Sequence, residues 1–174
     1  MSEQSQASKL ETKSVLLHLY SFGAVAVEGF IAAEKFVEGK TVDGVSIAWL
    51  GPDIKKFIKN KKREICVGPA ELKIHKLLVE AGDLPDGDNS GIITELDGKH
   101  KIMSAHLHDL LAHKQRTREF SSVVAYIPCD EDDGNAVLWA VHAYWRSLVA
   151  GWYILGRIVS GPYIWHAGFQ VVSL

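Results

Sequence analysis

Residues 121–172, SSVVAYIPCDEDDGNAVLWAVHAYWRSLVAGWYILGRIVSGPYIWHAGFQVV, decide the fold class of this chain. The stretch is rich in valine, isoleucine, tryptophan and tyrosine, which are the residues that favour β-strands. Turn-forming residues divide it into four apolar segments, at 121–127, 137–146, 152–159 and 164–172. Because short turns separate these segments, we expect four antiparallel strands that follow one another as a meander.

The preceding part of the chain alternates between helical and extended patterns. Apolar spacing together with glycine and proline breakpoints predicts helices over 24–39, 52–62 and 69–82. Val45, Ile47 and Trp49 alternate, which indicates a short strand between the first two helices. The sequence therefore predicts an α+β fold, in which a helical N-terminal half packs on a C-terminal antiparallel sheet of about four strands.

Two further elements are expected before the C-terminal sheet. The pair Asp97-Gly98 lies between the short runs 92–96 and 99–103, which is typical of a β-hairpin. Ser104 can cap a helix that continues to about residue 115.

The length of 174 residues suits one domain. Residues 1–7 are polar, so we expect a disordered tail, followed by a single domain over 8–174. The loop DLPDGDNSG at 83–91 could form an internal boundary. Cys66 and Cys129 are too few for a disulfide framework and lie in apolar stretches, which favours two buried free thiols.

The formal net charge is −2, and charged residues interrupt every apolar run before it reaches membrane-spanning length. The first residues, MSEQSQASKLETK, contain no apolar core of a secretory signal. We therefore expect a cytoplasmic protein that does not associate with a membrane.

The C-terminal strands carry an unusual number of aromatic and polar aromatic side chains. Within 137–146, alternation places Trp139 and Trp145 on one face of the strand and His142 and Tyr144 on the other. Aromatic rings on both faces exceed what one core needs, and tryptophan and tyrosine are favoured at binding surfaces. The candidate binding residues are Trp139, His142, Tyr144, Trp145, Trp152, Tyr153, Arg157, Trp165 and His166.

Two functions are consistent with this aromatic set. The first, which we favour, is a non-enzymatic domain that binds a protein partner or assembles with its own copies through the C-terminal sheet. The second is a small enzyme or ligand-binding domain, in which the same aromatic and histidine side chains line a pocket. The alternative that they are simply buried in the monomer remains open.

A third function comes from the basic residues of the second expected helix. These residues could contact the phosphates of a nucleic acid, although the acidic balance of the chain argues against it. They are Lys55, Lys56, Lys59, Lys62 and Arg63.

Metal and cofactor motifs are missing from the sequence. His106, Asp109 and His113 share one face of the expected helix, but the two histidines are about 10 Å apart along its axis. One ion could not reach both, so a solvated polar face is the simpler interpretation. The chain has no phosphate-binding loop, dinucleotide fingerprint or nucleophile elbow, so we expect no cofactor and no identifiable reaction.

Overall fold

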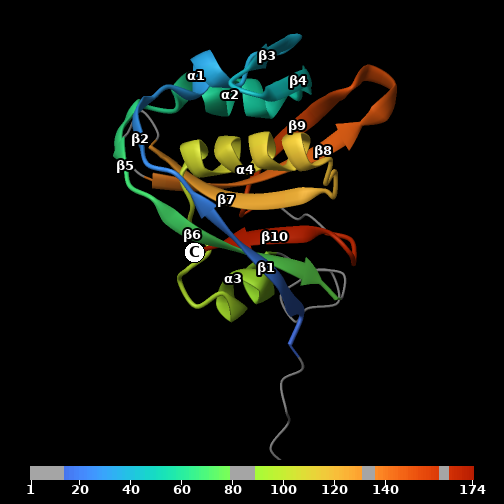
Figure 1. The fold of residues 1–174 in the computed structure, drawn as a ribbon. Coiled ribbons are helices and arrows are strands. Elements are labelled where there is room, and N and C mark those ends of the chain that lie inside the picture. The colour runs from blue at the N-terminus through green and yellow to red at the C-terminus, as the bar shows by residue number, and fades with distance from the viewer. Residues whose placement is uncertain (1–13, 79–88, 131–135, 161–164) are drawn as a thin grey trace, which may run out of the picture.

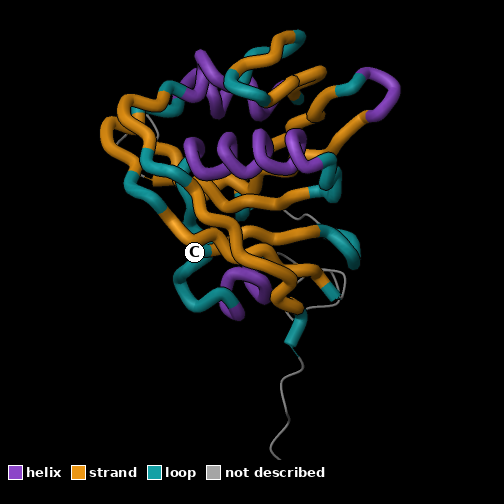
Figure 2. Tube along the Cα trace, viewed as in Figure 1, coloured by secondary structure: helices purple, strands orange, loops and turns teal. Residues whose placement is uncertain are grey.

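The computed structural model describes residues 14–78, 89–130, 136–160 and 165–174. Strands dominate these residues, and the helices among them are short (Figures 1 and 2). The strands form one eight-stranded mixed sheet and one two-stranded ribbon. The order across the large sheet is β1 (Leu16–Ala24), β6 (Ala70–Leu77), β10 (Gln170–Ser173), β7 (Val123–Asp130), β8 (Ala136–Arg146), β9 (Gly151–Ile158), β4 (Val45–Leu50) and β3 (Lys40–Val42).

Two parallel contacts make the large sheet mixed. β10 pairs in parallel with β7, and β4 pairs in parallel with β9, whereas the other neighbours are antiparallel. The ribbon consists of β2 (Val27–Phe30) and β5 (Glu64–Val67).

The helices divide between the two faces of the large sheet. Side chains of α1 (Ala32–Lys35), α2 (Pro52–Asn60) and α4 (Ser104–Thr117) contribute to one apolar cluster, on what we call the inner face. Side chains of α3 (Ser90–Glu95) contribute to a second cluster, on the outer face. Figure 1 shows α4 between the strands and α3 on the far side of β6 and β10.

The large sheet curves around α4. Val25, which follows β1, donates its backbone N–H to Asp109 Oδ2 at 2.9 Å, and Ser46 of β4 donates its own to Gln115 Oε1 at 2.9 Å. β1 and β4 are six strand positions apart, which in a flat sheet would separate them by about 29 Å. A helix only about 10 Å wide cannot bridge that distance, so the sheet must bend around it.

A buried carboxylate holds the first turn of α4. Glu64 of β5 accepts the backbone N–H groups of Ser104 at 2.8 Å and Ala105 at 3.1 Å. Its charge is favourable there because the N-terminus of a helix carries partial positive charge. Lys61 Nζ lies 3.6 Å from the same carboxylate and donates to Pro128 O at 2.6 Å. Ser104, expected as the capping residue, is instead the first residue of the helix.

A buried lysine ties the last turns of α4 to the sheet. Lys114 is fully buried, and its ammonium group donates to Gln170 Oε1 of β10 at 2.8 Å and pairs with Glu119. Glu119 also accepts from Tyr20 OH of β1 at 3.2 Å. The helix is therefore joined to a central strand and an edge strand through one polar network.

The expected α+β fold with a helical N-terminal half is wrong. Residues 24–39 form the end of β1, β2 and the four-residue α1, and residues 70–77 form β6 rather than a helix. Leu72 and Ile74 are buried with the period of a strand, Lys73 between them is half-buried, and Glu71 before them is exposed. Pairing with β1 and β10 on both sides favours this extended conformation over a helix.

The expected four-stranded meander is also wrong. β7, β8 and β9 are sequential neighbours as expected, but β10 inserts between β6 and β7 instead of pairing with β9. Asp97 and Gly98 do adopt the left-handed turn conformation, with φ of 48° and 77°, but this turn follows α3 instead of joining two strands. The tail 1–7 and most of the loop 83–91 lie outside the described residues.

Three expected elements outside the C-terminal sheet are confirmed. The strand at Val45–Leu50, the helix beginning at Pro52 and the helix beginning at Ser104 are all present. None of the helices in the described ranges combines the length and the apolar character that a bilayer crossing requires.

The carboxylate of Glu64 gives a direct test of the α4 anchor. Glu64→Gln removes the charge that faces two helix N–H groups and Lys61, so we expect a loss of about 1–2 kcal/mol in the free energy of unfolding. Chemical denaturation measures this loss. The exposed Glu71→Gln is the matched control and should change stability by less than about 0.5 kcal/mol. Equal effects of the two substitutions would contradict the anchor.

Candidate protein-docking surface

β8 places its aromatic side chains on both faces, as the alternation predicted. On the inner face, the ring of Trp139 contacts Phe57 of α2 at 5.3 Å, and Trp145 stacks on Phe120 at 4.3 Å. On the outer face, His142 and Tyr144 are adjacent, with ring centroids 5.2 Å apart. Trp139 and Trp145 therefore contribute to the core around α4.

β9 repeats this division. Trp152 is completely buried on the inner face, where its ring meets Trp145 at 5.4 Å. Tyr153 and Arg157 lie on the outer face, opposite Tyr144 and Ala140 of β8. The nine candidate residues therefore separate into three inner tryptophans and a group on the outer face.

The segment between β9 and β10 supplies the remaining two candidates, Trp165 and His166. In the large sheet, β8 and β7 separate β9 from β10, and the described residues Trp165 and Phe169 of the connecting segment lie against His142 of β8. Trp165 is buried against the outer face, 5.5 Å from the ring of His142, and its indole N–H donates to Asn89. His166 is exposed, and its ring lies 5.7 Å from Phe169.

Three half-buried rings form a continuous row over β4, β9 and β8. Trp49 lies 5.5 Å from Tyr153, which lies 5.6 Å from Tyr144. We call Trp49, Tyr144 and Tyr153 the outer aromatic surface. Helix α3 packs on the outer face over the other half of the sheet. Among the described residues, no helix covers this row.

Trp49 was not among the sequence candidates. Its alternation with Val45 and Ile47 placed it on their face, which is the core face. A register irregularity between Ile47 and Trp49 reverses this, so that Trp49 pairs with Tyr153 on the outer face while Leu50 returns to the core. Such a bulge inserts one residue and cannot be read from alternation alone.

The outer aromatic surface is flanked by positive charge. The guanidinium of Arg146 lies 5.3 Å from the ring centre of Tyr153, and Arg157 is exposed further along β9. Arg157 lies opposite Ala140 of β8, which is six residues from Arg146. The two arginine backbones are therefore about 20 Å apart along the strands. The sequences of β4, β8 and β9 contain no aspartate or glutamate.

Burial suppresses the charge of two histidines. Burial lowers the pKa of His142 to about 4, and it lowers the pKa of His108 to about 4 as well. His108 lies on the inner face between the rings of Phe30 and Phe36, at 5.7 and 5.3 Å. Both imidazoles are therefore neutral near pH 7.

The basic run does not form one free cationic face. Lys55 pairs with Glu38 at 3.0 Å, and the neighbouring Lys61 is drawn inward to Glu64. The guanidinium of Arg63 occupies the space where a side chain on Gly29 would lie. Of the other candidates for phosphate contact, Lys56, Lys59 and Lys62 are exposed.

The three weak metal candidates have separate structural roles. His106 Nε2 donates to Gly68 O at 3.1 Å, Asp109 accepts from Val25, and the ring of His113 lies 4.7 Å from Phe22. No group of three potential ligands is placed to hold a metal ion in the parts of the chain that the structure describes. Cys129 is buried as expected, but Cys66 is exposed, and neither forms a disulfide.

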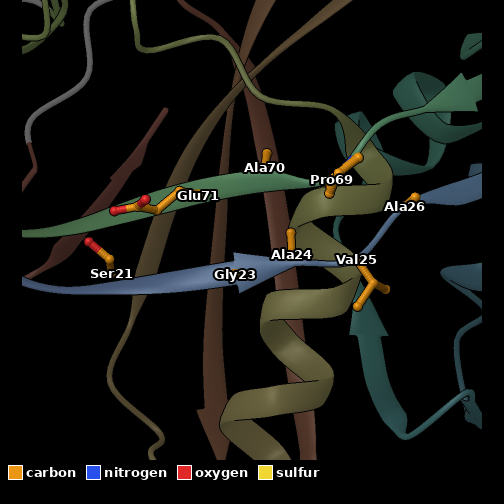
Figure 3. Close-up of a pocket in the computed structure, with 8 residues that line it drawn as sticks. All are labelled: Ser21, Gly23, Ala24, Val25, Ala26, Pro69, Ala70 and Glu71. Atoms are coloured by element: carbon orange, nitrogen blue, oxygen red, sulfur yellow. The ribbon is translucent and has the colours of Figure 1, made fainter.

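A shallow hollow of about 730 Å³ lies where β1 ends and β6 begins (Figure 3). Its lining is mostly glycine, alanine, proline and valine. The figure shows the two polar side chains, Ser21 and Glu71, together at one end and Pro69 and Val25 at the other. Because polar groups do not converge on its centre, this hollow offers no catalytic arrangement.

Comparison with known proteins gives no further guide. No family model, no curated protein and no solved structure matches the chain.

Adjacent residues of β9 test the division between the two faces. Trp152→Ala removes a fully buried ring, so we expect a loss of about 3–5 kcal/mol in the free energy of unfolding. Tyr153→Ala removes a half-buried ring on the outer face and should cost about 1 kcal/mol. Urea denaturation of the two variants measures the difference, and similar losses would contradict the assignment of faces.

The buried histidines predict a dependence of stability on pH. In the folded chain the pKa of His142 is about 4, below the ordinary value of 6.5. His142 is therefore harder to protonate in the folded chain than in the unfolded chain. This contribution is present above pH 6.5 and is lost as the pH falls toward 4, by about 3 kcal/mol at most.

His142→Phe keeps an aromatic ring at this position and should flatten the pH dependence over that range. Denaturant titrations at a series of pH values measure the slope, with the exposed His18→Gln as the control. An unchanged slope in His142→Phe would show that His142 is not held neutral by the fold.

Proposed function

We propose that this chain is a protein-binding domain whose outer aromatic surface docks an acidic segment of a partner protein. The observation that carries the proposal is the row of Trp49, Tyr153 and Tyr144, which crosses three neighbouring strands beyond the area that α3 covers. Rings that serve only the apolar clusters are almost fully buried, as Trp152 and Trp165 are, whereas the three rings of the row are half-buried.

The chemistry of the row suits protein recognition. Tyrosine and tryptophan combine a large apolar ring with a polar atom, so they tolerate water in the free protein and exclude it in a complex. Both have few rotatable bonds, so fixing them in an interface costs little conformational entropy. The ring contacts between the three residues limit their freedom before any partner binds.

Charge determines the kind of partner. Arg146 and Arg157 lie on the same face as the row, and the strands that carry the row contribute no acidic residue to this face. A segment with carboxylates spaced to reach the two arginines, and apolar side chains between them, would be complementary to this surface.

Charge also argues against pairing of this surface with its own copy. In a two-fold symmetric dimer, the same patch faces itself, so the arginines of the two copies would lie in one interface. No acidic residue of β4, β8 or β9 is available to offset them. A different, acidic protein is the better occupant.

The other two functions find less support in the geometry. Lys55, one of the five candidates for phosphate contact, pairs with Glu38, and Lys61 beside them is held inward by Glu64, which reduces the charge available for phosphates. The hollow at Ser21 and Glu71 brings no set of polar groups together.

Selection from a random-peptide library against the full chain tests the proposal. We expect the enriched peptides to combine acidic and apolar residues, and their affinity to fall as salt rises. Fluorescence anisotropy should show binding weakened about tenfold or more by Tyr144→Ser with Tyr153→Ser, and less strongly by Arg146→Gln. Val25→Ser, at an exposed apolar position next to α4, is the control.

Two results would overturn the proposal. Peptides that bind the tyrosine double variant as well as the unmodified chain would place the docking surface elsewhere. Self-association that is lost in the double variant, measured by sedimentation velocity, would show that the occupant is a second copy. The denaturation midpoint of each variant confirms that the fold is retained.

A further inference from the structure

His142 is a buried polar side chain without hydrogen bonds. It is 7% exposed, and neither ring nitrogen has a hydrogen-bond partner among the described residues. Aromatic rings surround it: Phe169 stacks on it at 4.9 Å, Tyr144 lies at 5.2 Å and Trp165 at 5.5 Å. A buried donor and a buried acceptor without partners are unfavourable, so the position of this imidazole requires an explanation.

The imidazole borders a small cavity on the outer face. The cavity has a volume of about 50 Å³ and is lined by Ala140, His142, Leu155, Gly156, Arg157 and Trp165. Gly156 contributes only its backbone to this lining, because a Cβ there would point to the inner face, 2.6 Å from Ile54 Cδ1. The small side chain of Ala140 leaves this space open, whereas a larger side chain at position 140 would fill it.

The lining of the cavity combines apolar walls with two nitrogen donors. Leu155 and Trp165 supply apolar surface, Arg157 supplies positive charge, and the neutral imidazole of His142 supplies one N–H. A volume near 50 Å³ exceeds the roughly 30 Å³ that one water molecule occupies in the liquid. It suits a group of three or four non-hydrogen atoms better than a phosphate with its larger shell of oxygens.

We propose that the His142–Arg157 cavity is a carboxylate-binding site, which receives an aspartate or glutamate side chain of the docked partner. The carboxylate accepts from the His142 N–H and from the Arg157 guanidinium, so the buried imidazole gains a partner. This inference rests on the proposed function, because the cavity opens on the same face as the outer aromatic surface. It adds a specific anchor point for one acidic residue of the bound segment.

Acetate is a minimal probe of this site. In the full chain labelled with ¹⁵N histidine and tryptophan, titration with sodium acetate should produce saturable shifts of the His142 ring nitrogens and the Trp165 indole N–H. Acetamide has nearly the same shape without the charge and should produce no such shifts. Sodium chloride at equal ionic strength controls for general salt effects.

Two variants locate the binding. Arg157→Gln changes an exposed residue and should weaken acetate binding about tenfold, while the fold is kept. His142→Phe should abolish the response at Trp165. If His142→Phe does not fold, Arg157→Gln and the acetamide comparison still decide the question. Equal shifts with acetate, acetamide and chloride, or an occupancy by water only, would overturn the carboxylate site.

The acidic peptides from the library separate this inference from the proposed function. A peptide that loses affinity in the Tyr144→Ser, Tyr153→Ser variant but not in Arg157→Gln would keep the docking surface and overturn the anchor. Acetate binding that depends on Arg157, without any peptide that depends on the tyrosines, would keep the carboxylate site and overturn protein docking. Loss of peptide binding in both variants supports both.

Discussion

The burial of α4 inside a curved sheet is the constraint on which the rest of the structure depends. A helix enclosed on several sides must satisfy its terminal N–H groups within the protein, because water cannot reach them. Glu64 meets this need at the first turn, and Lys114 with Gln170 fastens the last turns. The sheet must then curve, since strands near both of its edges contact the same helix.

Curvature around α4 determines which aromatic rings lie on the outer face of the sheet. The inner face has a finite volume, and Trp139, Trp145 and Trp152 fill it together with the apolar residues of α2 and α4. Strand alternation then forces the neighbouring Tyr144 and Tyr153 onto the opposite face. α3 covers only part of that face, so the outer aromatic surface follows directly from the packing of the core.

The sequence carried much of the local information but little of the topology. The strands around Tyr126, Trp139 and Trp152 were predictable because β-branched and aromatic residues lie between clear turns. The helix predicted over 69–82 rests on Pro69 and Gly82 as breakpoints and on an apolar spacing that includes both Leu77 and Leu78, although only Leu77 is buried. The place of β10 depends on pairing with β6, about a hundred residues away, and the face of Trp49 depends on a bulge. Neither leaves a signal in local periodicity.

The unexpected position of β10 is also what creates the environment of His142. In a meander, the last strand would extend the sheet beside β9, and its preceding segment would not cross β8. Because β10 pairs with β7 instead, the crossing segment brings Trp165 and Phe169 over the outer face and buries the imidazole between them. Among the described rings, Trp165 and Phe169 lie against His142, whereas Tyr153 lies against Tyr144 and Trp49. The position of β10 therefore leaves both the small cavity beside His142 and the half-buried row of rings on the same face of the sheet.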